Sequence, residues 1–88
     1  MSRVASRSES REVGVILGVT PTGHLTARAP GPTFAPEGTR VKDSAGQLSG
    51  RIVLVFGPVE RPYLSVRLKR APRPEQGLAL LGASLLRE

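Results

Sequence analysis

Glycine and proline interrupt this sequence throughout, with 10 glycines and 8 prolines among its 88 residues. Glycine weakens the interior of helices and strands, and proline lacks the amide hydrogen that both structures need. Turn signals recur about every 8 to 12 residues, which leaves room for short strands but not for long helices. The spacing therefore predicts an all-β protein of five or six short strands and argues against a helical bundle.

Residues 12–29 predict a β-hairpin, because valine and leucine alternate over 12–19, a turn follows at 20–23, and alternation resumes over 24–29. The second face of the first strand carries mainly small side chains, so a neighbouring backbone or a partner could approach it closely. The residues of this bare face are Gly14, Ile16 and Gly18. On the returning strand we expect Leu25, Ala27 and Ala29 to face inward.

The middle of the chain predicts a loop and two strands. Residues 30–38 are rich in proline and glycine, and we expect Phe34 within this loop to pack over the core. Residues 39–43 predict a short strand. Residues 50–56 form the most apolar run of the chain, which is typical of a central strand covered on both faces.

Residues 63–68 alternate again, with Leu64, Val66 and Leu68 expected inward and Tyr63, Ser65 and Arg67 outward. Residues 70–77 predict a loop. The last segment, 78–88, fits one helical face and a strand about equally well, because its glycines weaken the helix. Five or six strands in so short a chain predict a closed or nearly closed barrel, since closure removes exposed sheet edges.

The chain has no cysteine and one histidine, His24, which excludes disulfide scaffolds, cysteine-zinc sites and thiol catalysis. The seven acidic residues lie in tails, turns or strand ends rather than within apolar stretches suited to acid–base catalysis. Nucleophile elbows, phosphate-binding loops and metal-ligand spacings are missing. We therefore expect a non-enzymatic protein without cofactor or metal, in which His24 is exposed or caps a turn.

Residues 1–11 are rich in serine and arginine without periodicity, and they predict a flexible tail before a single domain at 12–88. No apolar run approaches the roughly 20 residues that span a bilayer, and the N-terminus lacks the apolar core of a signal peptide. We therefore expect a cytoplasmic protein.

The net charge of +6 favours polyanions or an acidic partner. Five cations follow one another without an intervening acid, and we expect them on one rim of the barrel: Arg61, Arg67, Lys69, Arg70 and Arg73. Such a rim could contact a phosphate backbone, although a solvated face that maintains solubility explains it about equally well.

The segment 56–63 is the most informative one. Gly57 permits a sharp exit from the preceding strand, and Pro58 and Pro62 stiffen the link to the next strand. A preorganised apolar loop loses little entropy on docking, which suits a protein–protein contact. Taken alone, however, these residues are better explained as a stiff turn that sets the strand register than as a docking loop.

The stretch GRIVLVFGPVERPYLSVRLK, residues 50–69, resembles the signature of the Gar protein family, a subunit of H/ACA ribonucleoproteins. The matching positions are Gly50, Phe56, Gly57, Pro58, Val59, Pro62, Tyr63 and Val66. Weaker similarity extends over residues 12–88. The resemblance implies a six-stranded β-barrel like that of translation elongation factors, with a strand in the C-terminal segment. Because glycine-arginine-rich tails and a basic C-terminal extension are missing, it implies a minimal archaeal form.

Family membership would imply a role without catalysis. Gar proteins bind the catalytic domain of the H/ACA pseudouridine synthase and assist its thumb loop in substrate loading and product release. The complex modifies guide-selected uridines, largely in ribosomal RNA, and its guide RNA and other proteins would be indirect partners.

Two sets of residues are candidates for the synthase-facing surface. The first comprises Gly57, Pro58, Val59, Pro62 and Tyr63, with Phe56 as a partly buried structural anchor. The second is the bare face of Gly14, Ile16 and Gly18. Two alternatives remain: a free-standing RNA-binding barrel that uses the basic rim, and a ligand-binding or enzymatic barrel, for which no residue provides a signal.

Overall fold

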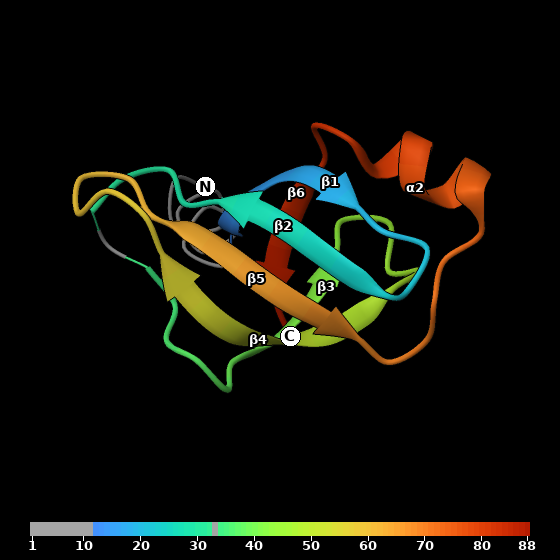
Figure 1. The fold of residues 1–88 in the computed structure, drawn as a ribbon, viewed down its shortest axis with the longest axis horizontal. Helices are drawn as coiled ribbons and strands as arrows, with labels where there is room; N and C mark the ends of the chain where they lie inside the picture. Colours follow the sequence, from blue (N-terminus) through green and yellow to red (C-terminus); the bar gives the residue numbers. More distant parts are fainter. Residues whose placement is uncertain (1–11, 33) are drawn as a thin grey trace, which may run out of the picture.

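The strands of this chain close into an antiparallel β-barrel with the order β1-β2-β5-β4-β3-β6 (Figure 1). The computed structural model describes residues 12–32 and 34–88, so the predicted tail at 1–11 lies outside the described residues. The strands are β1 Glu12–Val19, β2 His24–Arg28, β3 Arg40–Asp43, β4 Ser49–Phe56, β5 Tyr63–Leu68 and β6 Ser84–Arg87, and the helix α2 spans Pro74–Leu80. The predicted all-β barrel of six strands is confirmed. Among the described residues, no helix is long and apolar enough to cross a membrane.

The barrel interior is filled by short aliphatic side chains from the strands. Leu25, Ala27 and Ala29 face inward as predicted, and so do the three apolar residues of β5, Leu64, Val66 and Leu68. Alternate residues of a strand point to opposite sides, and the inside of a small barrel is just wide enough for such side chains. The period-two pattern of β2 and β5 is therefore a direct consequence of burial on one side only.

The prediction that Gly14, Ile16 and Gly18 form a bare, accessible face of β1 is wrong, because this strand is bulged. Its register shifts between Ile16 and Gly18 in the pairing with β2, and between Glu12 and Gly14 in the pairing with β6. A bulge inserts an unpaired residue and changes which side chains point inward. Ile16 is 1% exposed and Gly14 is buried, whereas Leu17 is 49% exposed. Only Gly18 of the proposed face remains partly accessible.

Residues 50–56 form a strand as predicted, but the prediction that both of its faces are covered is wrong. Ile52 is buried, but Val53 and Leu54 are each nearly half exposed, and the register shifts between Ile52 and Leu54. A barrel of this size consists of one sheet, so the outer face of β4 has no second layer to cover it. Gly50 allows β4 to approach β5 closely, because a Cβ there would collide with the carbonyl oxygen of Arg67.

The loop at 30–38 packs through a different residue than predicted. Phe34 is 47% exposed, so it does not cover the core, and the neighbouring Ala35 is buried instead. A small side chain fits under the loop where the barrel is already filled.

Asp43 is the one charged residue in the core of the described chain, at 1% exposure. Its carboxylate accepts hydrogen bonds from the backbone N–H groups of Leu48 at 2.6 Å and Ala45 at 3.1 Å. These bonds satisfy donors of the turn between β3 and β4, so Asp43 has a structural role.

The C-terminal segment contains both a helix and a strand. α2 begins at Pro74, within the stretch predicted as a loop, so that prediction is wrong from this residue on. Proline suits the first helical position, and the Gln76 side chain accepts a hydrogen bond from the backbone N–H of Arg73 at 2.9 Å. Gly82, with φ of +81°, lies in the turn between α2 and β6, and its N–H donates to the carbonyl oxygen of Ile16. β6 then closes the barrel between β1 and β3, while α2 lies outside it, beside β1 (Figure 1).

Candidate docking surface

The β4–β5 loop, residues 57–62, projects from the end of the barrel opposite α2 (Figure 1). Val59 at its tip is 83% exposed, the highest value among the large exposed hydrophobic side chains described. Pro62 at its base is buried, and its carbonyl oxygen accepts a hydrogen bond from the N–H of Ala29 at 2.9 Å. The loop therefore presents an apolar tip on an anchored base.

The conformation of the loop is set by backbone geometry. Gly57 has φ of +97°, and a Cβ at this position would lie 2.7 Å from Cδ2 of Tyr63. Both the left-handed backbone and the close ring favour glycine here. The N–H of Arg61 donates to the carbonyl oxygen of Pro58 at 3.3 Å, and its Nε donates to the carbonyl oxygen of Ala29 at 3.2 Å. These contacts support the expectation of a preorganised loop.

An aromatic pair lies at the base of the loop on the outer face of the sheet. The rings of Phe56 and Tyr63 stack with their centroids 5.5 Å apart and an interplanar angle of 21°. The guanidinium of Arg28 lies 4.7 Å from the centroid of the Tyr63 ring, within the range of a cation–π contact. Phe56 was predicted to be a partly buried anchor; its side chain is 43% exposed, and its ring packs on that of Tyr63.

Sequence reasoning missed the part of this surface that β4 provides. Val53 and Leu54 are exposed on the same strand as Phe56 and extend the apolar area along the barrel. In the sequence they belong to an uninterrupted apolar run, which resembles a strand buried on both sides. The bulge at this point provided no signal in the residue pattern.

The second predicted docking patch does not form. Ile16 belongs to the core and Gly14 packs against the backbone of Arg28, where a Cβ would lie 2.8 Å from the carbonyl oxygen. The two glycines of β1 therefore differ: Gly14 allows close strand packing, whereas a Cβ at Gly18 would meet no heavy atom within 4 Å beyond its chain neighbours.

The predicted basic rim does not form one patch, because β5 separates Arg61 from the other four cations. Arg61 lies in the β4–β5 loop, before β5, whereas the other four cations lie at or beyond its far end, and all are exposed: Arg67, Lys69, Arg70 and Arg73. Six residues of strand span roughly 20 Å. Arg61 therefore belongs to the docking surface, and the remaining cations lie toward α2.

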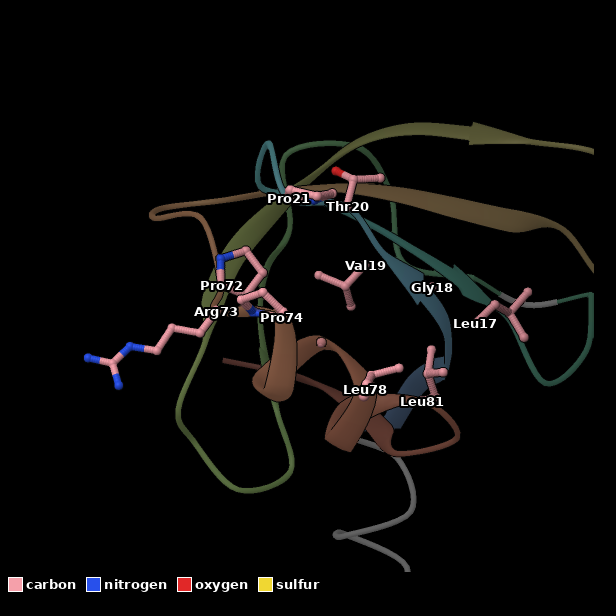
Figure 2. A pocket seen from close by; sticks show the side chains of 11 residues that line it. Leu17, Gly18, Val19, Thr20, Pro21, Pro72, Arg73, Pro74, Leu78 and Leu81 are labelled. Carbon is pink, nitrogen blue, oxygen red and sulfur yellow. The ribbon is translucent and has the colours of Figure 1, made fainter.

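An apolar hollow of about 460 Å³ lies at the end of the barrel that carries α2. It is bounded by the end of β1, the turn after it, and the helix, and its apolar lining includes Leu17, Val19, Pro21, Leu78 and Leu81. Arg73 is its one ionisable lining residue, and Figure 2 shows this side chain extending away from the others. The hollow was missed because the sequence pattern did not reveal the helix that forms one of its walls.

The described residues offer no group of three or more His, Asp or Glu side chains that could hold a metal ion. His24 is exposed, which is one of the two environments expected for it. Its Nδ1 lies 3.4 Å from the hydroxyl oxygen of Thr22.

Comparison with protein-family models finds no match to this chain, and comparison with curated proteins finds none either. The features of this chain that bear on its function are therefore the geometry of the β4–β5 loop and the motif in residues 50–69.

Proposed function

We propose that this protein is a non-catalytic subunit of an H/ACA ribonucleoprotein that binds the catalytic domain of the pseudouridine synthase through the β4–β5 loop. The observation that carries the proposal is the exposed tip of this loop on a rigid base, with Val59 at 83% exposure. Its sequence, Phe56-Gly57-Pro58-Val59 followed by Pro62-Tyr63, is the motif by which the chain resembles the Gar family.

The geometry suits protein docking for a physical reason. A loop whose backbone is restrained by Pro58 and Pro62 and by the hydrogen bonds of Arg61 loses little conformational entropy on binding. The aromatic pair and the neighbouring apolar residues of β4 add surface of the kind that dominates interface cores. A stiff turn that only sets the strand register would not require an apolar tip.

The first test is a calorimetric titration of Val59→Asp against the H/ACA synthase of the same source. A carboxylate in the interface core costs about 2 to 4 kcal/mol of binding, which corresponds to an increase of about 30- to 700-fold in Kd. Because Val59 is exposed in the free protein, the variant should keep the thermal stability of the wild type.

A matched control is Leu78→Asp, which places the same charge on another highly exposed apolar residue, in α2 at the opposite end of the barrel. This variant should bind the synthase as the wild type does. Equal affinity of Val59→Asp and the wild type would contradict the assignment of the loop, and no binding by the wild type would overturn the proposed function.

The thumb-loop role requires a kinetic readout. If the subunit promotes substrate loading and product release, adding it should raise multiple-turnover pseudouridylation more than the rate of the chemical step in a single turnover. Val59→Asp should lose this effect at concentrations where the wild type saturates the synthase.

A further inference from the structure

A row of basic side chains crosses four neighbouring strands on the outer face of the barrel. His24 of β2 pairs with Arg67 of β5, Arg67 pairs with Arg51 of β4, and Arg51 pairs with Arg40 of β3. All four side chains are exposed. Directly paired residues of antiparallel strands have their Cβ atoms about 4.5 to 5.5 Å apart. The three guanidinium groups therefore originate from adjacent positions on one face, and we call this set the cationic row.

The cationic row works against the stability of the sheet. Like charges directly opposite each other on neighbouring strands are destabilising. β2, β4 and β5 contain no acidic residue that could offset this repulsion, and Asp43 of β3 points into the core. An acidic residue adjoins the row at one end, where the N–H of Glu88 donates to the carbonyl oxygen of Arg40. A polyanionic ligand bound across the middle of the row would offset this repulsion.

The surface next to the cationic row is shallow. The neighbouring cross-strand row pairs Gly18 with Thr26, Thr26 with Ser65, and Ser65 with Leu54. Three of these four residues have small side chains, and two of them carry hydroxyl groups that can donate hydrogen bonds. An extended anionic chain could therefore lie against the sheet without displacing large side chains.

We propose that the cationic row binds the phosphodiester backbone of RNA; the choice of RNA over other polyanions rests on the proposed function. Guanidinium groups match phosphate oxygens with two parallel hydrogen bonds, and each neutralised phosphate releases condensed counterions. Nucleic-acid interfaces are more polar and more positively charged than protein–protein interfaces. The cationic row has this character, whereas the β4–β5 loop carries one acid and one base, Glu60 and Arg61, beside its apolar residues. Arg67 follows Tyr63 by four residues, about 13 Å along β5, so the two surfaces are separate parts of one face.

The test measures binding of the full chain to a fluorescein-labelled 15-nucleotide oligouridylate by fluorescence anisotropy, between 50 and 200 mM salt. The variant R51Q/R67Q removes two central charges of the cationic row. Its affinity at low salt should fall at least about tenfold, and the slope of log K against log[salt] should become shallower by about 1.4, at 0.7 per contact on single strands.

The matched control is R70Q/R73Q, which carries the same net charge but alters exposed arginines beyond the end of β5, outside the cationic row. It should change the affinity by less than about threefold and leave the slope almost unchanged. The thermal midpoint of R51Q/R67Q should equal or exceed that of the wild type, because a repulsion is removed. R51K/R67K preserves the charge, so it should retain the slope but bind more weakly.

Three results would overturn the inference: no salt-dependent binding of the wild type, equal losses in R51Q/R67Q and R70Q/R73Q, or tighter binding of a 12-residue polyglutamate than of the oligouridylate. The first would exclude RNA as the ligand, the second would indicate a net-charge effect, and the third would indicate an acidic protein partner. None of these measurements includes the synthase, so their outcome is independent of the test at Val59.

Discussion

Individual glycines of this chain meet different physical demands, and the local geometry tells them apart. At Gly50 the backbone dihedrals are ordinary, but a Cβ would collide with the neighbouring strand. At Gly38 the φ angle of +92° alone favours glycine, because a Cβ added there would meet no heavy atom within 4 Å beyond its chain neighbours. Gly57 combines both demands, with φ of +97° and the Tyr63 ring at 2.7 Å. Gly57 is therefore the residue on which the shape of the β4–β5 loop depends most.

We expect Gly57→Ala to lower the free energy of unfolding by more than Gly38→Ala. A non-glycine residue in the left-handed region costs about 1 to 3 kcal/mol, and the variant at Gly57 must also displace the ring of Tyr63. Denaturant unfolding of both variants measures this difference, and Gly38→Ala serves as the control for the φ angle alone.

Tyr63 is the only tyrosine of a chain without tryptophan, so its near-UV circular dichroism reports the ring directly. This signal should change in Gly57→Ala and not in Gly38→Ala. Equal stability losses with an unchanged signal would show that the ring has room to accommodate a methyl group.

At the scale of elements, α2 shows how a helix forms in a region whose composition argues against it. Seven residues are too few for an isolated helix to be stable in water. This one is held by a proline at its first turn, by the Gln76 hydrogen bond and by the buried side chain of Leu80. Gly77 is its weakest position, because glycine has a low helix propensity.

Gly77→Ala should therefore stabilise the protein by about 0.5 to 1 kcal/mol. The added Cβ would lie 3.6 Å from the Cβ of Val19, which is ordinary van der Waals contact. Chemical unfolding would measure the gain. Gly82→Ala is the control of opposite sign, because φ of +81° there disfavours alanine. A destabilised Gly77→Ala variant would show that α2 cannot accept even a methyl group against β1.

At the scale of the whole molecule, stability depends on closure of the barrel. β6 pairs with β1 on one side and with β3 on the other, and it contributes the fully buried Leu85. Without it, the sheet would have two open edges and a gap in its core. A small domain has little stability to spare, because it buries a smaller share of its surface than a large one.

Deletion of residues 84–88 should abolish cooperative thermal unfolding and produce oligomers through the exposed edges of β1 and β3. Circular dichroism melting and size-exclusion chromatography test this expectation. Removal of Glu88 alone, which lies beyond the last strand, should leave a cooperative transition. A monomeric truncated chain with a sharp transition would show that closure is not required for folding.

The sequence pattern by itself determined the fold class and the strands that are buried on one side. Turn residues at regular intervals limit every element to a short length, and alternation in β2 and β5 follows from one-sided burial, so both are local properties that a sequence displays. The stiffness of the β4–β5 loop was likewise predictable from its prolines, because proline fixes its own φ angle wherever it occurs.

Only the tertiary structure decided which side chains of β1 and β4 point outward and which residues form a surface together. Bulges at these strands change the facing of Ile16, Leu17 and Leu54 without a residue signature, because they depend on how the neighbouring strand pairs. The cationic row has the same origin: Arg40, Arg51 and Arg67 are far apart in the chain, and strand register brings them side by side. Pairing across strands is a non-local property, so no pattern within one segment reveals it.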